Sequence, residues 1–83
     1  MIKVVLLASI RERLGCDQFA LELDQASLSV AELTEQLSQR GELWRSALQD
    51  DKVLVAVNQQ MSRSDAVVND GDEVAFFPPV TGG

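Results

Sequence analysis

One amphipathic helical pattern, placed between two groups of short strand patterns, is the feature that most limits how this chain can fold. The helix is predicted to begin at Ser29, because Ser29 and Glu32 have the spacing of a capping box, in which each side chain binds the other residue's backbone N–H. Its apolar stripe follows at Val30, Leu33 and Leu37. Such a stripe must be covered, and strands are the elements available to cover it.

Two strand patterns precede this helix. Residues Ile2–Ala8 are rich in aliphatic and β-branched side chains, and Asp17–Leu23 alternates apolar with polar residues. The two segments are therefore predicted to pair as an antiparallel hairpin. The charged residues 11–13, together with Gly15, are interpreted as the turn that separates them.

The chain after the helix is predicted to form a shorter second helix and further strands. Gly41 is placed to end the first helix in a left-handed C-cap, and Glu42–Gln49 keeps helical spacing. The remaining segments are a largely buried strand at Val53–Val57, a turn at Asn58–Gln60, a very short strand at Ala66–Val68, a turn at Asn69–Asp72 and a last strand at Glu73–Phe77.

This order of elements predicts an α+β fold. Hairpin strands, one packed helix and strands that return beside the first are the plan of the ubiquitin-like β-grasp fold, here a mixed sheet of about four to five strands on one main helix plus a short second helix. A chain of 83 residues is long enough for one core. The domain is expected to span residues 1–77, and residues 78–83 are expected to form a flexible, extended tail.

Charge and hydropathy narrow the classes of partner. Thirteen acidic residues against seven basic ones give a formal charge of -6, which argues against nucleic-acid binding and favours a basic protein partner. No apolar run approaches the roughly 20 residues that span a bilayer, and the first residues lack the pattern of a secretory signal. A cytoplasmic protein without membrane contact is the expectation.

The residue types present exclude several kinds of catalytic site. The sequence has no histidine and one cysteine, so it cannot build a Cys-His dyad, a Ser-His-Asp triad, a histidine-ligated zinc site or an internal disulfide. Cys16 has no paired base to activate it and is interpreted as incidental to function. We expect this chain to bind no metal and no cofactor.

The last six residues carry the strongest functional pattern. Pro78 and Pro79 restrict the backbone, so the chain is expected to leave the last strand in a stiff, extended direction. Val80 and Thr81 then lead to Gly82-Gly83, where the absence of side chains lets another protein close around the backbone. A tail of this length can reach roughly 20 Å. A terminal glycine carboxylate is open to activation as an acyl-adenylate, which a sulfur or amine nucleophile can attack.

The whole chain resembles the small subunit of molybdopterin synthase, a family of ubiquitin-like sulfur carriers. The segment "NDGDEVAFFPPVTGG" at residues 69–83 carries most of the resemblance, supported by "AVN" at 56–58, "IKV" at 2–4 and "RE" at 11–12. The resemblance implies that an activating enzyme uses ATP and magnesium to adenylate Gly83, and that sulfur from a persulfide relay, with its sulfurtransferase, converts it to a thiocarboxylate. The large synthase subunit then takes up the tail, and the sulfur passes to cyclic pyranopterin monophosphate.

The same resemblance assigns roles along the tail. Gly83 would carry the adenylate and then the sulfur, Gly82 would give a narrow approach, and Thr81, Val80, Pro79 and Pro78 would line the partner's channel. Catalysis would lie in the large subunit, because this chain has no catalytic site of its own. The family's complex is a heterotetramer of two large and two small subunits.

Alternation along the strands predicts where the large subunit docks. If Val74 and Phe76 enter the core with the even-numbered residues of the first strand, then Phe77 and Ala75 face outward, because successive side chains point to opposite faces. An apolar patch beside the tail usually marks an interface. The predicted docking residues are Phe77, Ala75, Leu7 and Val5, with Arg11 as a rim charge.

Three other functions remain open from the sequence. A carrier that donates sulfur for thiamin thiazole has a similar Gly-Gly tail on a similar fold, and a ubiquitin-like modifier would join lysines through Gly83. A binding module whose tail is inert is the third, and it predicts that deletion of Gly82-Gly83 leaves function intact.

Overall fold

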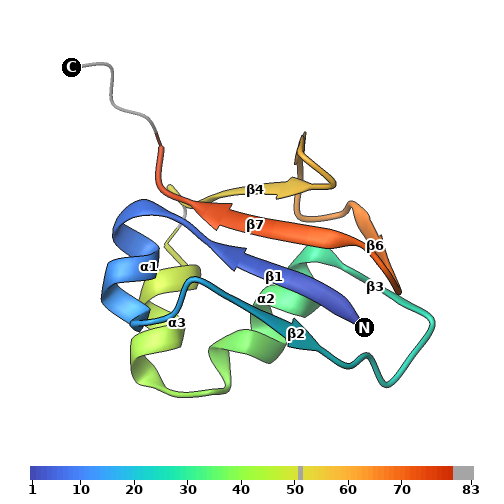
Figure 1. Ribbon diagram of the computed structural model, residues 1–83, viewed down its shortest axis with the longest axis horizontal. Helices are drawn as coiled ribbons and strands as arrows, with labels where there is room; N and C mark the ends of the chain where they lie inside the picture. The colour runs from blue at the N-terminus through green and yellow to red at the C-terminus, as the bar shows by residue number, and fades with distance from the viewer. Residues whose placement is uncertain (51, 80–83) are drawn as a thin grey trace.

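A computed structural model of the protein describes residues 1–50 and 52–79. Within these residues the strands and helices surround one core (Figure 1). The elements in chain order are β1 (Ile2–Leu6), α1 (Ala8–Leu14), β2 (Gln18–Leu21), β3 (Ser27–Ser29), α2 (Val30–Ser38), α3 (Glu42–Leu48), β4 (Leu54–Val57), β5 (Gln60–Ser62), β6 (Val67–Asn69) and β7 (Glu73–Phe77).

A five-stranded mixed sheet organises the domain, with strand order β2-β1-β7-β4-β5. β1 lies parallel to β7 and antiparallel to β2, while β4 lies antiparallel to both β7 and β5. The last strand therefore inserts at the centre, beside the first, as the sequence pattern predicted. β3 and β6 form a separate two-stranded antiparallel sheet. The α+β class and the ubiquitin-like fold are confirmed.

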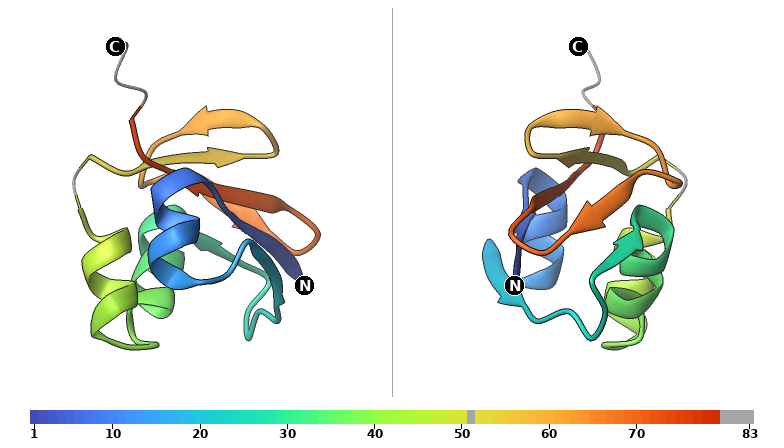
Figure 2. Two further views of the ribbon diagram at one scale, coloured as in Figure 1. Left: turned by 60° about the vertical axis from the view of Figure 1, so that its left-hand side comes forward. Right: turned by 90° about the vertical axis from the view of Figure 1, so that its right-hand side faces the viewer.

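The core lies between the sheet and its helices. α2 and α3 pack on one face of the sheet, and α1 lies at one end of the strands (Figures 1 and 2). Among the described residues no helix covers the opposite face. The predicted inward set of β1 and β7 is fully or almost fully buried, namely Ile2, Val4, Leu6, Val74 and Phe76.

The capping box that predicted α2 is formed. The Glu32 N–H donates to the Ser29 Oγ at 3.1 Å, and the Ser29 N–H donates to the Glu32 Oε1 at 2.9 Å. Leu33 and Leu37 are buried against the sheet, as the apolar stripe requires. Local pattern and tertiary packing agree here.

The segment between β1 and β2 was wrongly interpreted as a turn. β1 ends at Leu6 instead of Ala8, and residues 8–14 form the helix α1, so residues 1–50 and 52–79 hold three helices where two were expected. The antiparallel pairing of the two strands is nevertheless correct. The signal was present, since Ile10 and Leu14 are four residues apart and both contact the core, but the charged residues between them suggested a loop.

Gly41 was wrongly predicted as a left-handed C-cap. α2 ends at Ser38 with Gln39 as its C-cap in a right-handed conformation. Gly41 instead precedes α3 as its N-cap, with φ 155° and ψ 171°. This extended region at positive φ is open almost only to glycine. The glycine therefore did mark the break between the two helices, although the left-handed conformation predicted for it was wrong.

Two strands of three residues were not predicted, and a third was displaced. β3 and β5 went unrecognised, and the expected strand at Ala66–Val68 is found at Val67–Asn69. Asn58 and Gln59 do turn the chain, both with positive φ, as in a two-residue hairpin of type I′. Gln60, which was assigned to that turn, begins β5.

Candidate functional site

The sheet face without a helix carries an apolar surface, called here the open face. Ala75 lies at its centre, opposite Val5 of β1 on one side and Ala56 of β4 on the other. Phe77 lies opposite Leu54 at the end of β7. Paired residues point to the same side of a sheet, so these five side chains are neighbours on one face, where Ala56 is 9% exposed and the other four are half-buried. The face predicted for Val5, Ala75 and Phe77 is confirmed, and their docking role stays a prediction.

The open face extends beyond the residues that sequence reasoning selected. Met61 of β5 is opposite Ala56 and is 62% exposed. Leu54, Ala56 and Met61 were missed, because Val53–Val57 was expected to be covered on both sides and β5 was not recognised. The useful signal was the pair Asn58-Gln59, which suits a tight hairpin and would have placed Met61 beside Ala56.

The root of the tail lies at one end of this face. Phe77 and Pro78 are half-buried, and Pro79 is exposed. Leu7 is 39% exposed, and its backbone N–H donates to the Phe76 carbonyl at 3.1 Å, which joins the end of β1 to the end of β7. The two strands finish side by side there (Figures 1 and 2).

Arg11 and the tail residues are the remaining predicted site residues. Arg11 is exposed on α1, and no ion pair joins it to an acid among residues 1–50 and 52–79. The tail assignments to Val80, Thr81, Gly82 and Gly83 lie outside the described residues.

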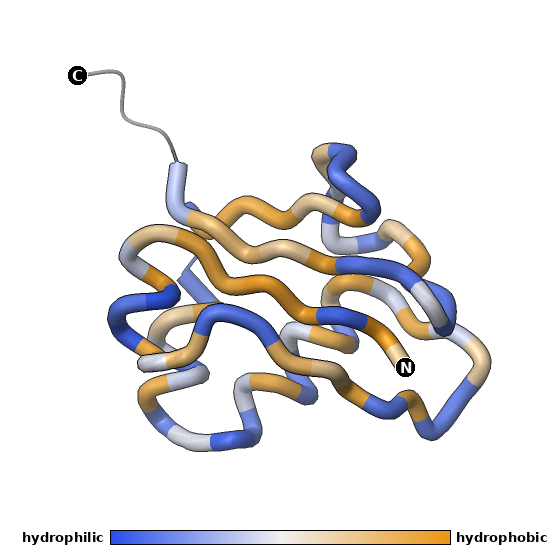
Figure 3. The backbone as a smooth tube through the Cα atoms, viewed as in Figure 1, coloured by the Kyte–Doolittle hydropathy of each residue, from blue (hydrophilic) through white to orange (hydrophobic). Residues whose placement is uncertain are grey.

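The opposite end of β7 is polar. Lys3 and Glu73 are register partners on the open face, with Nζ and Oε1 4.0 Å apart. Along β7 the chain thus changes from charged Glu73 at its start to apolar Phe77 at its end, and the tube in Figure 3 turns from blue to orange along this strand. A partner that binds the apolar end would therefore have few charged groups to remove from water.

Asp72 organises this polar end. Its Oδ2 accepts the Asn69 N–H at 2.8 Å, and its Oδ1 accepts the Asn58 Nδ2 at 3.0 Å. The backbone hydrogen bond from Asn69, and then the bond from Asn58, lower the pKa of the Asp72 carboxyl from its ordinary value of 3.8. Asn58 also accepts the Glu73 N–H at 3.0 Å, so the network ties the β4–β5 turn to the start of β7.

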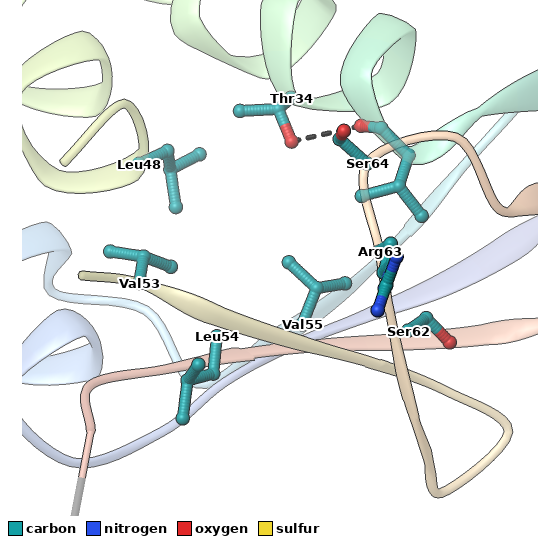
Figure 4. A pocket seen from close by; sticks show the side chains of 9 residues that line it. Thr34, Leu48, Val53, Leu54, Val55, Ser62, Arg63 and Ser64 are labelled. Atoms are coloured by element: carbon teal, nitrogen blue, oxygen red, sulfur yellow. Dashed lines mark hydrogen bonds between the residues drawn. The ribbon is translucent and has the colours of Figure 1, made fainter. Parts of the chain in front are cut away.

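A surface cavity of about 440 Å³ lies on the helix side of β4 (Figure 4). Val53 and Val55 point into it, and Leu54, which also lines it, extends to the other side of β4. Thr34 on the helix wall uses its hydroxyl to donate to the Val30 carbonyl at 2.9 Å. Arg63 and the neighbouring serines line the other wall. The cavity is thus on the other side of the sheet from the predicted docking residues.

The described part of the chain offers neither a metal site nor a membrane span. Within residues 1–50 and 52–79 no group of three acidic, cysteine or histidine side chains is placed to hold a metal ion. No helix in the same residues has the length and apolar character needed to cross a bilayer. Cys16 is partly exposed, and its thiol is 3.9 Å from the Gln18 carbonyl.

Comparison with protein families decides where this chain belongs. A sequence model of the ThiS family matches residues 4–83, which is nearly the whole chain and includes the terminal glycines. The chain belongs to the ThiS family. Comparison with individual relatives shows how much of this chain is similar to each of them.

A curated relative from Escherichia coli strain K12 is named molybdopterin synthase sulfur carrier subunit. It is 46% identical over 83 residues, and the match covers 100% of both chains. A solved structure from Pyrococcus furiosus, provisionally described as subunit 1 of a molybdopterin converting factor, is 32% identical with a TM-score of 0.79, and the match covers 95% of this ThiS family chain and 97% of that one.

A further solved structure is a complex of subunits 1 and 2 of the molybdopterin-converting factor from Helicobacter pylori. The matched chain is 24% identical with a TM-score of 0.67, and the match covers 99% of this ThiS family chain and 97% of that one. At this identity the likeness shows a shared fold.

Proposed function

We propose that this chain is the sulfur carrier subunit of a molybdopterin synthase. The observation that carries the proposal is the full-length match, at 46% identity, to a relative with that name. The sheet supports it, because an apolar face without a covering helix lies directly beside the strand that leads into the tail. A carrier needs both a docking surface and a reactive end that projects from it.

The proposed chemistry uses the carboxylate of Gly83. In the partner activating enzyme this carboxylate attacks the α-phosphate of ATP with the help of Mg²⁺, pyrophosphate leaves, and a glycyl adenylate forms. The outer sulfur of a persulfide on the relay then attacks the adenylate carbonyl and AMP leaves. A second thiol of the relay cleaves the resulting acyl disulfide, which releases the thiocarboxylate and leaves a disulfide on the relay. The sulfur passes from there to cyclic pyranopterin monophosphate, and two such transfers build the dithiolene of molybdopterin. The domain contributes recognition, and the partners contribute the catalytic groups.

Docking on the large subunit is proposed to use the apolar end of the open face. Phe77 and Leu7 lie at the tail root, with Ala75 and Val5 toward the centre of the face, and Pro78-Pro79 would direct the tail away from the last strand. Arg11 supplies a charge near the rim. With the tail inserted in the large subunit's channel, two small and two large subunits would form a heterotetramer in the cytoplasm.

Intact mass spectrometry tests the carrier function. The chain is incubated with the activating enzyme, ATP, Mg²⁺ and a sulfur source, and a mass gain equal to exchange of one oxygen for sulfur, localised to Gly83, is expected. A variant that lacks Gly82-Gly83 is the control and should gain nothing. An unchanged mass, with an activating enzyme that modifies its own known carrier in the same assay, would contradict the proposal.

Sulfur donation for thiamin thiazole is the second candidate, because the matching family model is that of the ThiS family. Both carriers would form the same thiocarboxylate, so the acceptor separates them. Transfer of labelled sulfur from the loaded chain to cyclic pyranopterin monophosphate on a large synthase subunit supports the first candidate. Transfer only in the presence of a thiazole-forming enzyme supports the second.

A further inference from the structure

Ala8 has a backbone conformation that alanine rarely adopts. Its φ is 51°, in the left-handed region, where the β-carbon crowds the backbone and where glycine is the usual residue. The residue lies at the point where the chain leaves β1 and begins α1. A left-handed alanine persists only when the structure around it fixes the turn.

The surroundings show what this turn fixes. Leu6 and Ile10 are both buried, so the chain is anchored on either side of Leu7 and Ala8. The Leu7 N–H is bound to the Phe76 carbonyl, and the Leu7 carbonyl accepts the N–H groups of Ile10 at 3.2 Å and Arg11 at 3.3 Å. Because the chain is anchored on both sides, a change of φ at Ala8 would have to be compensated at Leu7, so the angle at Ala8 limits the directions open to the exposed Leu7 side chain.

Alanine and glycine differ in how tightly they hold that angle. Alanine in the left-handed region occupies a narrow range, because its β-carbon excludes most other positive-φ conformations. Glycine at the same position would adopt the observed angle without strain, and would also reach conformations on both sides of φ = 0°. Ala8 therefore confines the backbone more tightly than glycine would, and the cost is backbone strain. It does so next to the end of β7, which leads into the tail.

We propose that Ala8 is a positioning residue for docking: its confined left-handed backbone holds Leu7 at the tail root in the orientation that the large subunit binds. This inference rests on the proposed function. Preorganised surface groups bind more tightly, because less conformational freedom is lost in the complex. Loosening this one residue should weaken binding about fivefold.

Three variants separate confinement from strain. Ala8→Gly removes both, whereas replacement of Ala8 by D-alanine through chemical ligation removes the strain and keeps a confined positive φ. Gln59→Gly is the matched control, because Gln59 also has a positive φ, 68°, but lies in the β4–β5 turn away from Leu7. Each variant is measured for thermal unfolding, for amide hydrogen exchange at Leu7 in the free chain, and for affinity to the large subunit by calorimetry.

We expect the variants to change stability and affinity independently of each other. Ala8→Gly should unfold at the same temperature or a higher one, exchange the Leu7 amide faster, and bind the large subunit about fivefold more weakly. The D-alanine chain should be more stable and keep the wild-type exchange and affinity. Gln59→Gly should keep the wild-type affinity.

Two results would overturn the proposal. One is an unchanged Leu7 exchange rate in Ala8→Gly, which would show that the alanine confines nothing. The other is an equal loss of affinity with glycine and with D-alanine, which would mean that the methyl group itself contacts the partner. If the wild-type chain does not bind the large subunit, the proposed function fails, and the exchange measurement on the free chain still decides whether Ala8 confines the backbone at Leu7.

Discussion

Arg40 closes one corner of the core by lying over two aromatic rings. Its guanidinium carbon is 4.3 Å from the centre of the Phe19 ring and 4.8 Å from that of Trp44. The two rings meet edge to face, with centres 5.8 Å apart. Arg40→Ala should lower the free energy of unfolding by about 1 kcal/mol, because it removes two partly exposed cation–π contacts and the aliphatic cover of the rings.

Trp44 is the single tryptophan of the chain, so its fluorescence reports on this corner during urea unfolding. Arg45→Ala is the control, since Arg45 is exposed on α3 and lies over neither of these rings. The interpretation of Arg40 as a cover for the rings fails if both variants lose the same stability and the Trp44 emission is unchanged.

Asp72 predicts how stability falls in acid. Hydrogen bonds from the Asn69 N–H and from Asn58 favour its ionised form, so the pKa of this carboxyl is lower in the folded than in the unfolded chain. Its contribution is complete above the ordinary value of 3.8 and is lost as the pH falls through the lowered value. Asp72→Asn should therefore flatten the decline of unfolding free energy as the pH falls from 3.8 through the lowered value. Asp24→Asn, a change in the exposed β2–β3 loop, should leave that slope unaltered.

The capping box determines how well α2 begins. Ser29→Ala removes the hydroxyl that accepts the Glu32 N–H, and leaves a donor of the first turn without its partner. We expect a loss of about 1 kcal/mol in unfolding free energy, measured by urea denaturation. Ser29→Asp keeps an acceptor at the N-cap and should recover most of that loss. Equal destabilisation by alanine and aspartate would show that the cap contributes little.

Elements whose local pattern agrees with their tertiary packing could be predicted from the sequence. α2 has both a cap and an apolar stripe, and β7 is a short apolar run that follows a strong turn signal, so each was recognised from the sequence. β3 and β5 have three residues each, too few for a periodic pattern, and they exist because a neighbouring strand pairs with them. α1 was hidden for another reason, since its inward residues Ile10 and Leu14 are separated by charged residues that point to solvent.

At the scale of the whole molecule, alternation assigned the β1 and β7 residues of the open face but not those of β4 and β5. Burial of Val74 and Phe76 forces Ala75 and Phe77 to the other side, and the parallel pairing with β1 brings Val5 beside them. Leu54 and Met61 could not be placed in the same way, because their neighbours depend on which strands pair across the sheet. The sequence pattern of a strand predicts which face of the sheet each residue occupies. The neighbours of that residue on adjacent strands depend on the order of the strands in the sheet.

Adjacent phenylalanines in β7 allow docking to be separated from folding. Phe76 is fully buried, so Phe76→Leu should lower the unfolding free energy by about 1 kcal/mol and leave the affinity of the folded chain for the large subunit unchanged. Phe77 is half-buried beside the tail root, and Phe77→Ala should weaken that affinity by about tenfold or more, a larger free-energy change than its loss of stability. Calorimetric titration and urea unfolding of both variants measure the two quantities. Unchanged affinity in Phe77→Ala would place the docking surface elsewhere, because the side chain at the centre of the proposed contact could then be removed without consequence.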